Sequence, residues 1–509
     1  MRDRSARQPA LVIHVFLRPE PPTAGTASPS PSPAEQYLRD LLATCAAVGM
    51  TETIPPFPAL TGITGLPSAP ASEPARISAA AASASGPYAD QAVLWTRRGI
   101  IGLSVALSAR AGADRSWGAQ WARWSAWAPA APAPEGVLET VVVARGLGSL
   151  ARRPDAVVEA RVRRLSGSCG ALSGPPGPWS RITGDRLLWQ IRTPTADTRR
   201  RTLVVLAATD EPTVDAWLWH TGGPEPAPLT LHLLQAALVR RQLRLLDREQ
   251  NAYEKLDRTA SEAADQLGGL HARALTDPAP LTGRMALRAE EELERLRVAA
   301  HTLAGKRSDL RTTRRAAQAL TQNMREAVPP GDDVPGSVLH TDRREAEWLA
   351  ARADDDAEYL SVTLERVETV LALGGRFVEE RARAQRQHAV TAQTALVGGL
   401  LAFLAGIQSL SYEVPLPGPF DAPVICALSL LVVVLPTGGL RLVRGGREDT
   451  TPVLFDLLGL GALGGGLGWL AATALWWTRH EQAAPPSWSW GAAALGAVLS
   501  ALFGRWRMR

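Results

Sequence analysis

The chain has few cysteines and few lysines. The cysteine shortage bears on disulfide and zinc sites, and the lysine shortage bears on the kind of genome that encodes the chain. Its 509 residues include three cysteines, Cys45, Cys169 and Cys426. They are odd in number and far apart, so neither a disulfide framework nor a zinc-ligand spacing follows from them. Nearly all basic residues are arginine, with only Lys255 and Lys306 as lysines, a usage typical of a GC-rich bacterial genome. The formal net charge of +5 is small for this length, so bulk charge does not argue for nucleic acid and no nucleic-acid partner is expected.

Motifs of catalysis and ligand binding are also missing from the sequence. There is no Walker A lysine motif and no convincing phosphate-binding loop. Cys169 and His220 lack the local signature of a nucleophile and its base. The acidic run Asp354–Glu358 has no EF-hand spacing, and charge runs on long helices usually face solvent. We therefore expect a protein that is not an enzyme and has no catalytic residue, cofactor or metal site.

The first 225 residues contain only short apolar segments. Glu35–Val48 has the apolar spacing of a helix. Two stretches rich in Pro, Ala and Ser, residues 19–33 and 68–87, have too few large apolar side chains to offset ordering entropy and predict mobile loops. Segments rich in Val, Ile, Leu or Trp predict strands at Leu11–Leu17, Ala92–Trp95, Ile100–Ala106, Leu138–Ala144, Leu187–Ile191 and Thr202–Ala207. The sequence therefore predicts a cytoplasmic α+β domain over residues 1–225.

Four tryptophans of this domain follow one another at helical spacing. Trp117, Trp121, Trp124 and Trp127 are separated by steps of four, three and three residues, which predicts an aromatic stripe on one helix face. Such a stripe either packs on the sheet or forms a surface for a ligand or partner, and the sequence leaves both open.

Residues 226–388 change to helical periodicity and predict a stalk. One amphipathic helix begins near Thr230 and reaches about Leu270, and a second spans about Gly283–Ala327. Asp342, with Glu345 three residues later, predicts the N-cap of a third helix that continues into the last quarter of the chain. The second helix has a coiled-coil seam, with two arginines as misfits, at Ala289, Leu293, Leu296, Ala300, Leu303, Arg307, Leu310, Arg314, Ala317, Leu320 and Met324. This seam can close within one chain or between chains of a homo-oligomer.

Residues 389–509 contain long runs without charge. A run of about 18 or more such residues is long enough to cross ~30 Å of hydrocarbon. Arginines alternate between the connecting segments as the positive-inside rule expects for four spans with both termini in the cytoplasm. The sequence predicts a transmembrane helical bundle of about four spans, embedded in the lipid bilayer of the inner (plasma) membrane, at Ala389–Leu410, Ala422–Leu440, Val453–Trp477 and Trp488–Phe503.

The third of these segments carries the candidate site residues of the predicted bundle. Gly461 with Gly465, and Gly464 with Gly468, are small residues one turn apart, which predicts close packing by another helix of the bundle or of another subunit. Asp456 is an ionisable residue near one end of the segment. Such residues are often functional within a membrane, but pairing with the preceding Arg-rich loop is favoured over ion conduction.

The whole layout resembles a family of membrane proteins of bacterial conflict systems, called CASPASE and TPR repeat-associated (CATRA) proteins. The residues that carry the resemblance are the opening strand "LVIHVFLRP", the junction "VDAWLWHTGGPEPAPLTLHLLQAALVRRQLRLL", the helical middle and the apolar tail. The resemblance implies a caspase-like protease and TPR-repeat proteins as partners, and a role in defence or programmed death. It supplies no catalytic residues.

Two functions follow as hypotheses. The first is a non-enzymatic, membrane-anchored conflict-system component, whose cytoplasmic head recruits or senses a caspase-like or TPR partner and whose stalk couples that event to the membrane. The alternative is an ion channel or transporter similar to the magnesium channel CorA, which also joins a cytoplasmic α+β domain to long helices and C-terminal spans. The characteristic Gly-Met-Asn motif of that channel is absent, and four spans are predicted instead of two.

Overall fold

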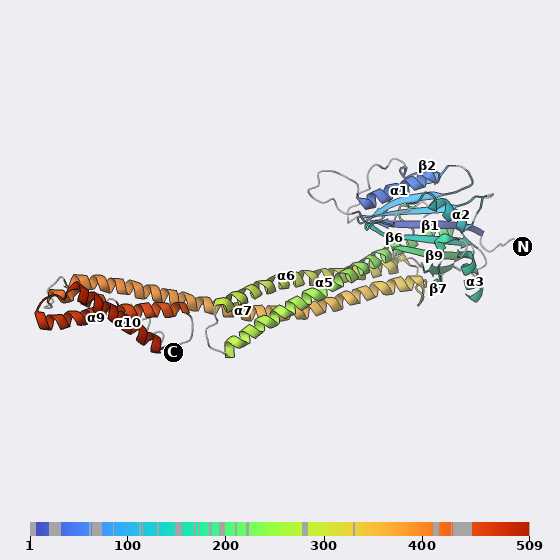
Figure 1. Cartoon of the computed structure of the whole chain (residues 1–509). Coiled ribbons are helices and arrows are strands. Elements are labelled where there is room, and N and C mark those ends of the chain that lie inside the picture. Colours follow the sequence, from blue (N-terminus) through green and yellow to red (C-terminus); the bar gives the residue numbers. More distant parts are fainter. Residues whose placement is uncertain are drawn as a thin grey trace. The chain divides into compact units, whose positions relative to one another are not determined.

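The computed structural model in Figure 1 describes residues 7–19, 32–60, 63, 74–84, 86–110, 113–114, 116–129, 132–147, 155–166, 169–172, 174–182, 186–192, 199–208, 211–219, 223–276, 283–328, 331–410, 417–428, 430 and 450–507. The chain forms two compact units. Unit 1 combines Met1–Glu254 with Gly305–Leu360, and unit 2 combines Lys255–Ala304 with Ser361–Arg509. Each unit draws on two stretches because three long helices contribute to both. The predicted domain boundaries after residues 225 and 388 stay predictions.

Unit 1 is built on a nine-stranded sheet with the order β2-β3-β4-β5-β1-β6-β9-β8-β7. Neighbouring strands are antiparallel, except that β6 and β9 are parallel. The strands are β1 (Arg7–Leu17), β2 (Met50–Thr53), β3 (Arg76–Ser83), β4 (Gln91–Arg97), β5 (Ile100–Ser108), β6 (Val137–Leu147), β7 (Pro176–Ile182), β8 (Arg186–Ile191) and β9 (Arg200–Ala207). All the strands that the sequence predicts are present, so the α+β prediction for this part of the chain is correct.

Strand β1 shows why its sequence is apolar at nearly every position. Successive side chains of a strand point to opposite faces of the sheet. Leu11 and Ile13 lie in one buried cluster, whereas Val12 and Phe16 lie in another. A sheet covered on both faces needs continuous apolar strands instead of alternating ones, and helices cover both faces here.

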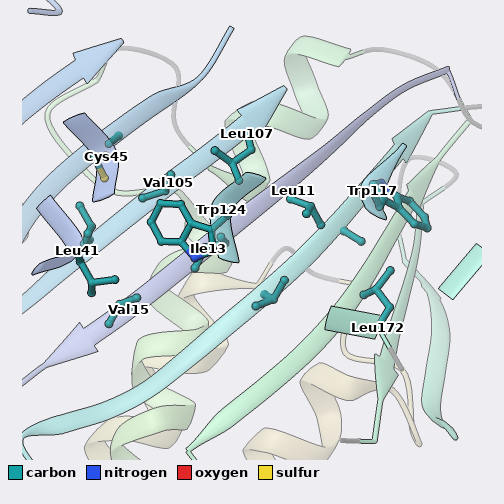
Figure 2. Close-up of a cluster of buried hydrophobic side chains, with 14 of the residues drawn as sticks. Leu11, Ile13, Val15, Leu41, Cys45, Val105, Leu107, Trp117, Trp124 and Leu172 are labelled. Carbon is teal, nitrogen blue, oxygen red and sulfur yellow. The ribbon is translucent and has the colours of Figure 1, made fainter. Parts of the chain in front are cut away.

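One face of the sheet is covered by α1 (Pro33–Ala47), α2 (Trp117–Ser125) and α3 (Asp155–Ser166). Ser32 caps α1 in a capping box, because its hydroxyl accepts from the Glu35 amide while the Glu35 carboxylate accepts from the Ser32 amide. Figure 2 shows Leu41 and Cys45 of α1 together with Trp117 and Trp124 of α2, gathered with residues of β1 and β5 in this cluster.

The opposite face is covered by α4 (Glu211–Leu218) and by the beginnings of α5 (Pro228–Thr276) and α7 (Val338–Leu410). Trp217 and Leu218 of α4, Leu233 of α5, and Val338 and Leu339 of α7 belong to the second buried cluster. The two ends of a long chain segment, near residues 228 and 338, therefore meet on the same sheet face.

Three strands escape the sequence patterns. Strand β3 lies inside the Ala- and Ser-rich stretch that predicts a mobile loop, and for Arg76–Ser83 that prediction is wrong. Ala79 and Ala81 are buried at 0% and 1% exposure, since small side chains fill the space between the sheet and the helices above it. Strands β2 and β7 are short or begin with Pro and Gly, which are weak strand signals.

The helical part of unit 1 consists of the start of α5, residues 305–327 of α6 (Gly283–Ala327), and residues 338–360 of α7. Leu310 and Ala317 of the predicted seam are buried at 1% exposure within the single chain. Arg314, a misfit in the seam, forms an ion pair with Asp354 of α7. The seam of α6 therefore closes within one chain in this unit.

The start of α7 differs from the prediction. Ser337, not Asp342, is in the capping position, where its hydroxyl accepts from the amide of His340 at 3.0 Å. Asp342 lies inside the helix and is buried at 1% exposure. The prediction that α7 runs without interruption into the apolar segment after residue 389 is confirmed, since the helix continues to Leu410.

In unit 2, α9 (Thr450–His480) packs against α10 (Pro486–Arg507) through small residues. A Cβ atom built on Gly464 would lie 2.0 Å from Ser500 Oγ, and one on Gly468 would lie 2.4 Å from the Ala492 carbonyl oxygen. Cβ atoms built on Gly461 and Gly465 would have more room, at 3.6 and 3.3 Å from carbonyl oxygens of α10. The glycines predicted to receive a close-packed helix therefore lie against α10 of the same chain.

The prediction of a transmembrane bundle is wrong for the part of the chain that the structure describes. No helix within those residues combines the length and apolarity needed to cross a bilayer. The predicted span Ala422–Leu440 lies largely outside the described residues. From Gly461 onward α9 is rich in glycine, alanine and tryptophan, which are less apolar than leucine or valine. A run without charged residues is therefore not as apolar as the prediction assumed. The predicted inner-membrane location depended on those spans and stays a prediction.

The contact between α9 and α10 leads to a prediction with a matched control. Gly468→Ala is expected to weaken this contact by roughly 1–3 kcal/mol, because the added methyl group meets backbone instead of a flexible side chain. At Gly491, in α10, an added Cβ atom would have nothing within 4 Å, so Gly491→Ala is expected to stabilise its helix by up to about 1 kcal/mol. Amide hydrogen exchange of α10 in the two variants measures the difference, and equal protection in both would contradict the close approach.

Candidate functional site

Charged side chains gather on the sheet face that α5 and α7 cover, inside an otherwise apolar layer. We call this group the charge network: Glu139 of β6, Arg201 of β9, His232 and Arg240 of α5, and Asp342 of α7. All five residues belong to unit 1. Burying charges is costly unless they are paired and hydrogen-bonded, so the geometry of each pair decides what the network does.

Asp342 is the centre of the charge network. Its Oδ2 atom accepts from Arg201 Nη1 at 2.8 Å and from His232 Nε2 at 3.2 Å, and its Oδ1 atom accepts from Arg240 Nη1 at 3.0 Å. The Asp342 side chain is 1% exposed. One carboxylate of α7 is therefore held by a strand of the sheet and by two residues of α5 that lie about two turns apart.

Arg240 joins Asp342 to a second carboxylate. Its Nε and Nη2 atoms donate to the two oxygens of Glu139 at 3.1 and 2.7 Å, a bidentate geometry that lysine cannot supply. Arg201 makes a further bond, from Nη2 to Gln190 Oε1 at 2.8 Å. Glu345, one turn after Asp342, lies 3.5 Å from Arg240 Nη1. The charges therefore alternate in sign across the contact between the sheet and the helices.

The electrostatics keep Asp342 and Arg240 ionised. Burial by itself raises the pKa of the Asp342 carboxyl, but the guanidinium groups of Arg201 and Arg240 outweigh burial and hold that pKa well below its usual range. Burial lowers the pKa of Arg240, whereas the carboxylates of Glu139 and Asp342 raise it by more. Chemically, the network is a set of fixed, mutually neutralised charges that joins the sheet to α5 and α7.

A second buried polar group lies nearer the centre of the sheet. His14 Nδ1 is 2.9 Å from Ser104 Oγ, on the antiparallel neighbour strand, and Trp95 Nε1 donates to the same oxygen at 3.2 Å. The Ser104 hydroxyl accepts from Trp95, and the tautomer of the imidazole sets whether it accepts from His14 Nδ1 or donates to it. Burial lowers the pKa of His14 to about 3. A serine next to a histidine invites comparison with nucleophilic catalysis, but both are buried at 2% exposure or less.

The four tryptophans of the predicted stripe are divided between the core and the surface. Trp117 and Trp124 are 4% and 3% exposed, and the indole of Trp117 donates to the Arg145 carbonyl at 2.8 Å. Trp121 is partly buried and has the Arg200 guanidinium 4.8 Å from its ring centroid. Trp127, just beyond α2, is 61% exposed. The structure therefore does not bring the four rings together on one open surface.

The remaining candidate residues from the sequence are either buried or outside what the structure describes. Cys169 is buried at 1% exposure, and His220 lies outside the described residues. Asp456 lies in α9, and its side chain is outside what the structure describes. Among the residues that the structure describes, no group of three or more His, Cys, Asp or Glu side chains is arranged to hold a metal ion. The expectation of no metal site stays a prediction.

The charge network was missed by the sequence patterns, although one signal for it exists. Glu139 interrupts the apolar strand "VLETVVVA", and His232 interrupts the apolar start of α5. A polar residue in a segment that is otherwise buried requires a buried partner. The pattern Asp342-x-x-Glu345 was assigned to a helix cap instead, because capping is the more frequent use of that spacing.

The network joins two regions that family comparison recognises separately. The model of the CASPASE and TPR Repeat-Associated N-terminal domain matches residues 10–222, and the model of the corresponding C-terminal domain matches residues 227–367. The chain belongs to this CATRA family. Glu139 and Arg201 lie in the N-terminal domain, and His232, Arg240 and Asp342 lie in the C-terminal domain.

Other comparisons add little. A search of curated proteins found no match. A solved structure, the complete CorA magnesium transporter from Methanocaldococcus jannaschii, is 11% identical and covers 62% of this chain and 93% of its own, with a TM-score of 0.23. A likeness of this size carries no argument for a common fold or activity.

Proposed function

We propose that this chain is a non-enzymatic adapter of a bacterial conflict or defence system, which binds a caspase-like protease or a TPR-repeat protein. The proposal is supported by the family to which the chain belongs, whose two domains are described as associated with caspase and TPR repeats. The adapter acts by binding instead of by catalysis.

The observation that carries the proposal is the fixed contact between the two family domains. Arg201 of the N-terminal domain and Asp342 of the C-terminal domain form an ion pair of 2.8 Å, with side chains 5% and 1% exposed. Arg145 of β6 and Asp215 of α4 form another pair of 2.8 Å on the N-terminal side. A rigid connection of this kind lets a sheet domain hold a helical surface ready for a partner, which lowers the ordering cost of binding.

Direct titration tests the proposal. The purified full chain is titrated calorimetrically with a TPR-repeat protein and with a caspase-like protein from the same organism. We expect saturable binding to at least one of them with a Kd of about 1 μM or tighter, which corresponds to about −8 kcal/mol. Absence of binding to both, with a chain whose sheet amides are protected from exchange, would refute the adapter role.

A further inference from the structure

Helix α7 exposes large side chains along one face in unit 1. Trp348 is 53% exposed and Tyr359 is 61% exposed. Arg352 and Asp355 lie between them, so the four residues follow one another at steps of four, three and four, which places them on one side of a helix. We call these residues the α7 ridge. The opposite side of the same turns is core, since Leu349, Ala353, Ala357 and Leu360 are all 3% exposed or less.

The α7 ridge is held in position by α5. The Arg352 guanidinium lies 5.2 Å from the centroid of the Trp348 ring, which is within the range of a cation–π contact. The same guanidinium donates to Asp247 Oδ1 at 2.9 Å and to Gln250 Oε1 at 2.8 Å. Trp348 is therefore exposed and at the same time fixed in orientation, so it loses little entropy when a partner covers it.

Carboxylates border the α7 ridge. Asp355 and Glu358 are exposed on α7, and the Asp247 side chain on α5 is 62% exposed. The net charge of the whole chain is positive, +5, so this acidic border is a local feature. Exposed Trp, Tyr and Arg are the residues in which binding hot spots are enriched, and an acidic border selects a partner with a basic rim.

We propose that the α7 ridge inserts into the concave groove of the TPR-repeat partner, with Trp348 in an apolar pocket and basic side chains facing Asp355 and Glu358. This inference rests on the proposed adapter function. Stacked helical repeats form extended concave surfaces, and a single projecting helix face fits such a groove. The ridge lies within residues 227–367, the match of the C-terminal family domain.

Trp127 provides a matched control. It is 61% exposed, similar to Trp348, but it lies beyond the end of α2 within the N-terminal family domain. Trp348→Ala and Trp127→Ala therefore make the same chemical change on two different exposed surfaces. Neither change removes a buried side chain, so both variants are expected to fold as the parent chain does.

The test is a titration of the full chain and its variants with a purified TPR-repeat protein from the same organism. Trp348→Ala is expected to weaken binding about thirtyfold or more, as hot-spot truncations do. Tyr359→Ala is expected to weaken it about tenfold, and Trp127→Ala less than about twofold. Asp355→Asn is expected to slow association mainly, with an effect that disappears at high salt.

The outcomes separate the ridge from the adapter role. If the parent chain binds and Trp348→Ala binds equally well, the ridge is refuted while the adapter function stands. If the parent chain binds neither partner, the adapter function fails. If sedimentation shows that Trp348→Ala dissociates a dimer of the parent chain, the ridge is an interface between two copies, which overturns its assignment to the TPR-repeat protein.

Discussion

Replacing Asp342 with alanine is expected to weaken the contact between α7 and the sheet by about 3–5 kcal/mol, because the substitution leaves Arg201 and Arg240 buried without their shared carboxylate. A buried pair adds little net stability compared with well-packed apolar residues, but removal of one partner leaves an uncompensated charge. Hydrogen exchange of peptides from the start of α7 and from β6 measures the effect, as an acceleration of roughly a hundredfold to several thousandfold.

Asp355→Ala is the control for this experiment. Asp355 lies on the same helix and is exposed, so its removal is expected to change exchange in the same peptides by less than about 0.5 kcal/mol. If the two variants exchanged at the same rate, the charge network would not hold the two family domains together.

The sign of the pH dependence of this contact follows from the lowered pKa of Asp342. In the unfolded chain an aspartate has a pKa of about 3.9. The pKa of Asp342 in the folded chain is lower than this value. The unfolded chain therefore binds more protons than the folded chain once the pH falls to about 4. The contribution of Asp342 is therefore complete above about pH 5 and declines as the pH falls from about 4 toward the folded value. Asp342→Ala removes this contribution together with its pH dependence.

The second large effect concerns His14. Its pKa is lowered by burial from 6.5 to about 3, so the unfolded chain takes up a proton on the histidine at a pH where the folded chain does not. Stability is therefore full above about pH 6.5 and declines by about 1.4 kcal/mol for each pH unit below it. Between pH 6.5 and 4.5 the expected loss is about 2–3 kcal/mol.

His14→Leu removes the titrating group and is expected to flatten the decline between pH 6.5 and 4.5. Urea unfolding followed by tryptophan emission measures it, because Trp95 bonds to Ser104 beside His14. His301→Gln, at an exposed position of α6, is the control and is expected to keep the parent slope. A parent slope in His14→Leu would mean that His14 is not kept neutral by the sheet.

Sequence patterns predicted the sheet where strands are buried on both faces. The run Leu11–Leu17 is apolar because helices cover both sides of β1. They failed for β3, whose alanines are buried yet carry almost no strand signal, since propensity alone does not register packing against neighbours. They succeeded for α6, since prolines come before its first residue and a stretch with proline and glycine follows its last.

The site depends on contacts between residues far apart in the chain, which no local pattern reports. Asp342 is separated by more than a hundred residues from both Arg201 and His232. The local pattern predicted that Asp342 caps a helix, whereas its contacts with residues far away in the chain place it at the centre of the charge network. The apolar tail was misjudged for a related reason. Length without charge was taken as sufficient for a membrane span, whereas within the described residues no helix reaches the required apolarity.

Hydrogen exchange of the full chain, measured with and without the proposed TPR-repeat protein, tests the adapter role and the α7 ridge most directly. The TPR-repeat protein is expected to protect peptides covering residues 344–360 of α7, while peptides of β1 and β5 exchange as they do in the free chain. Protection confined to residues around Trp127 would place the contact on the N-terminal domain instead. If saturating concentrations of the TPR-repeat and caspase-like proteins left every peptide unchanged, the chain would not be an adapter for either of them.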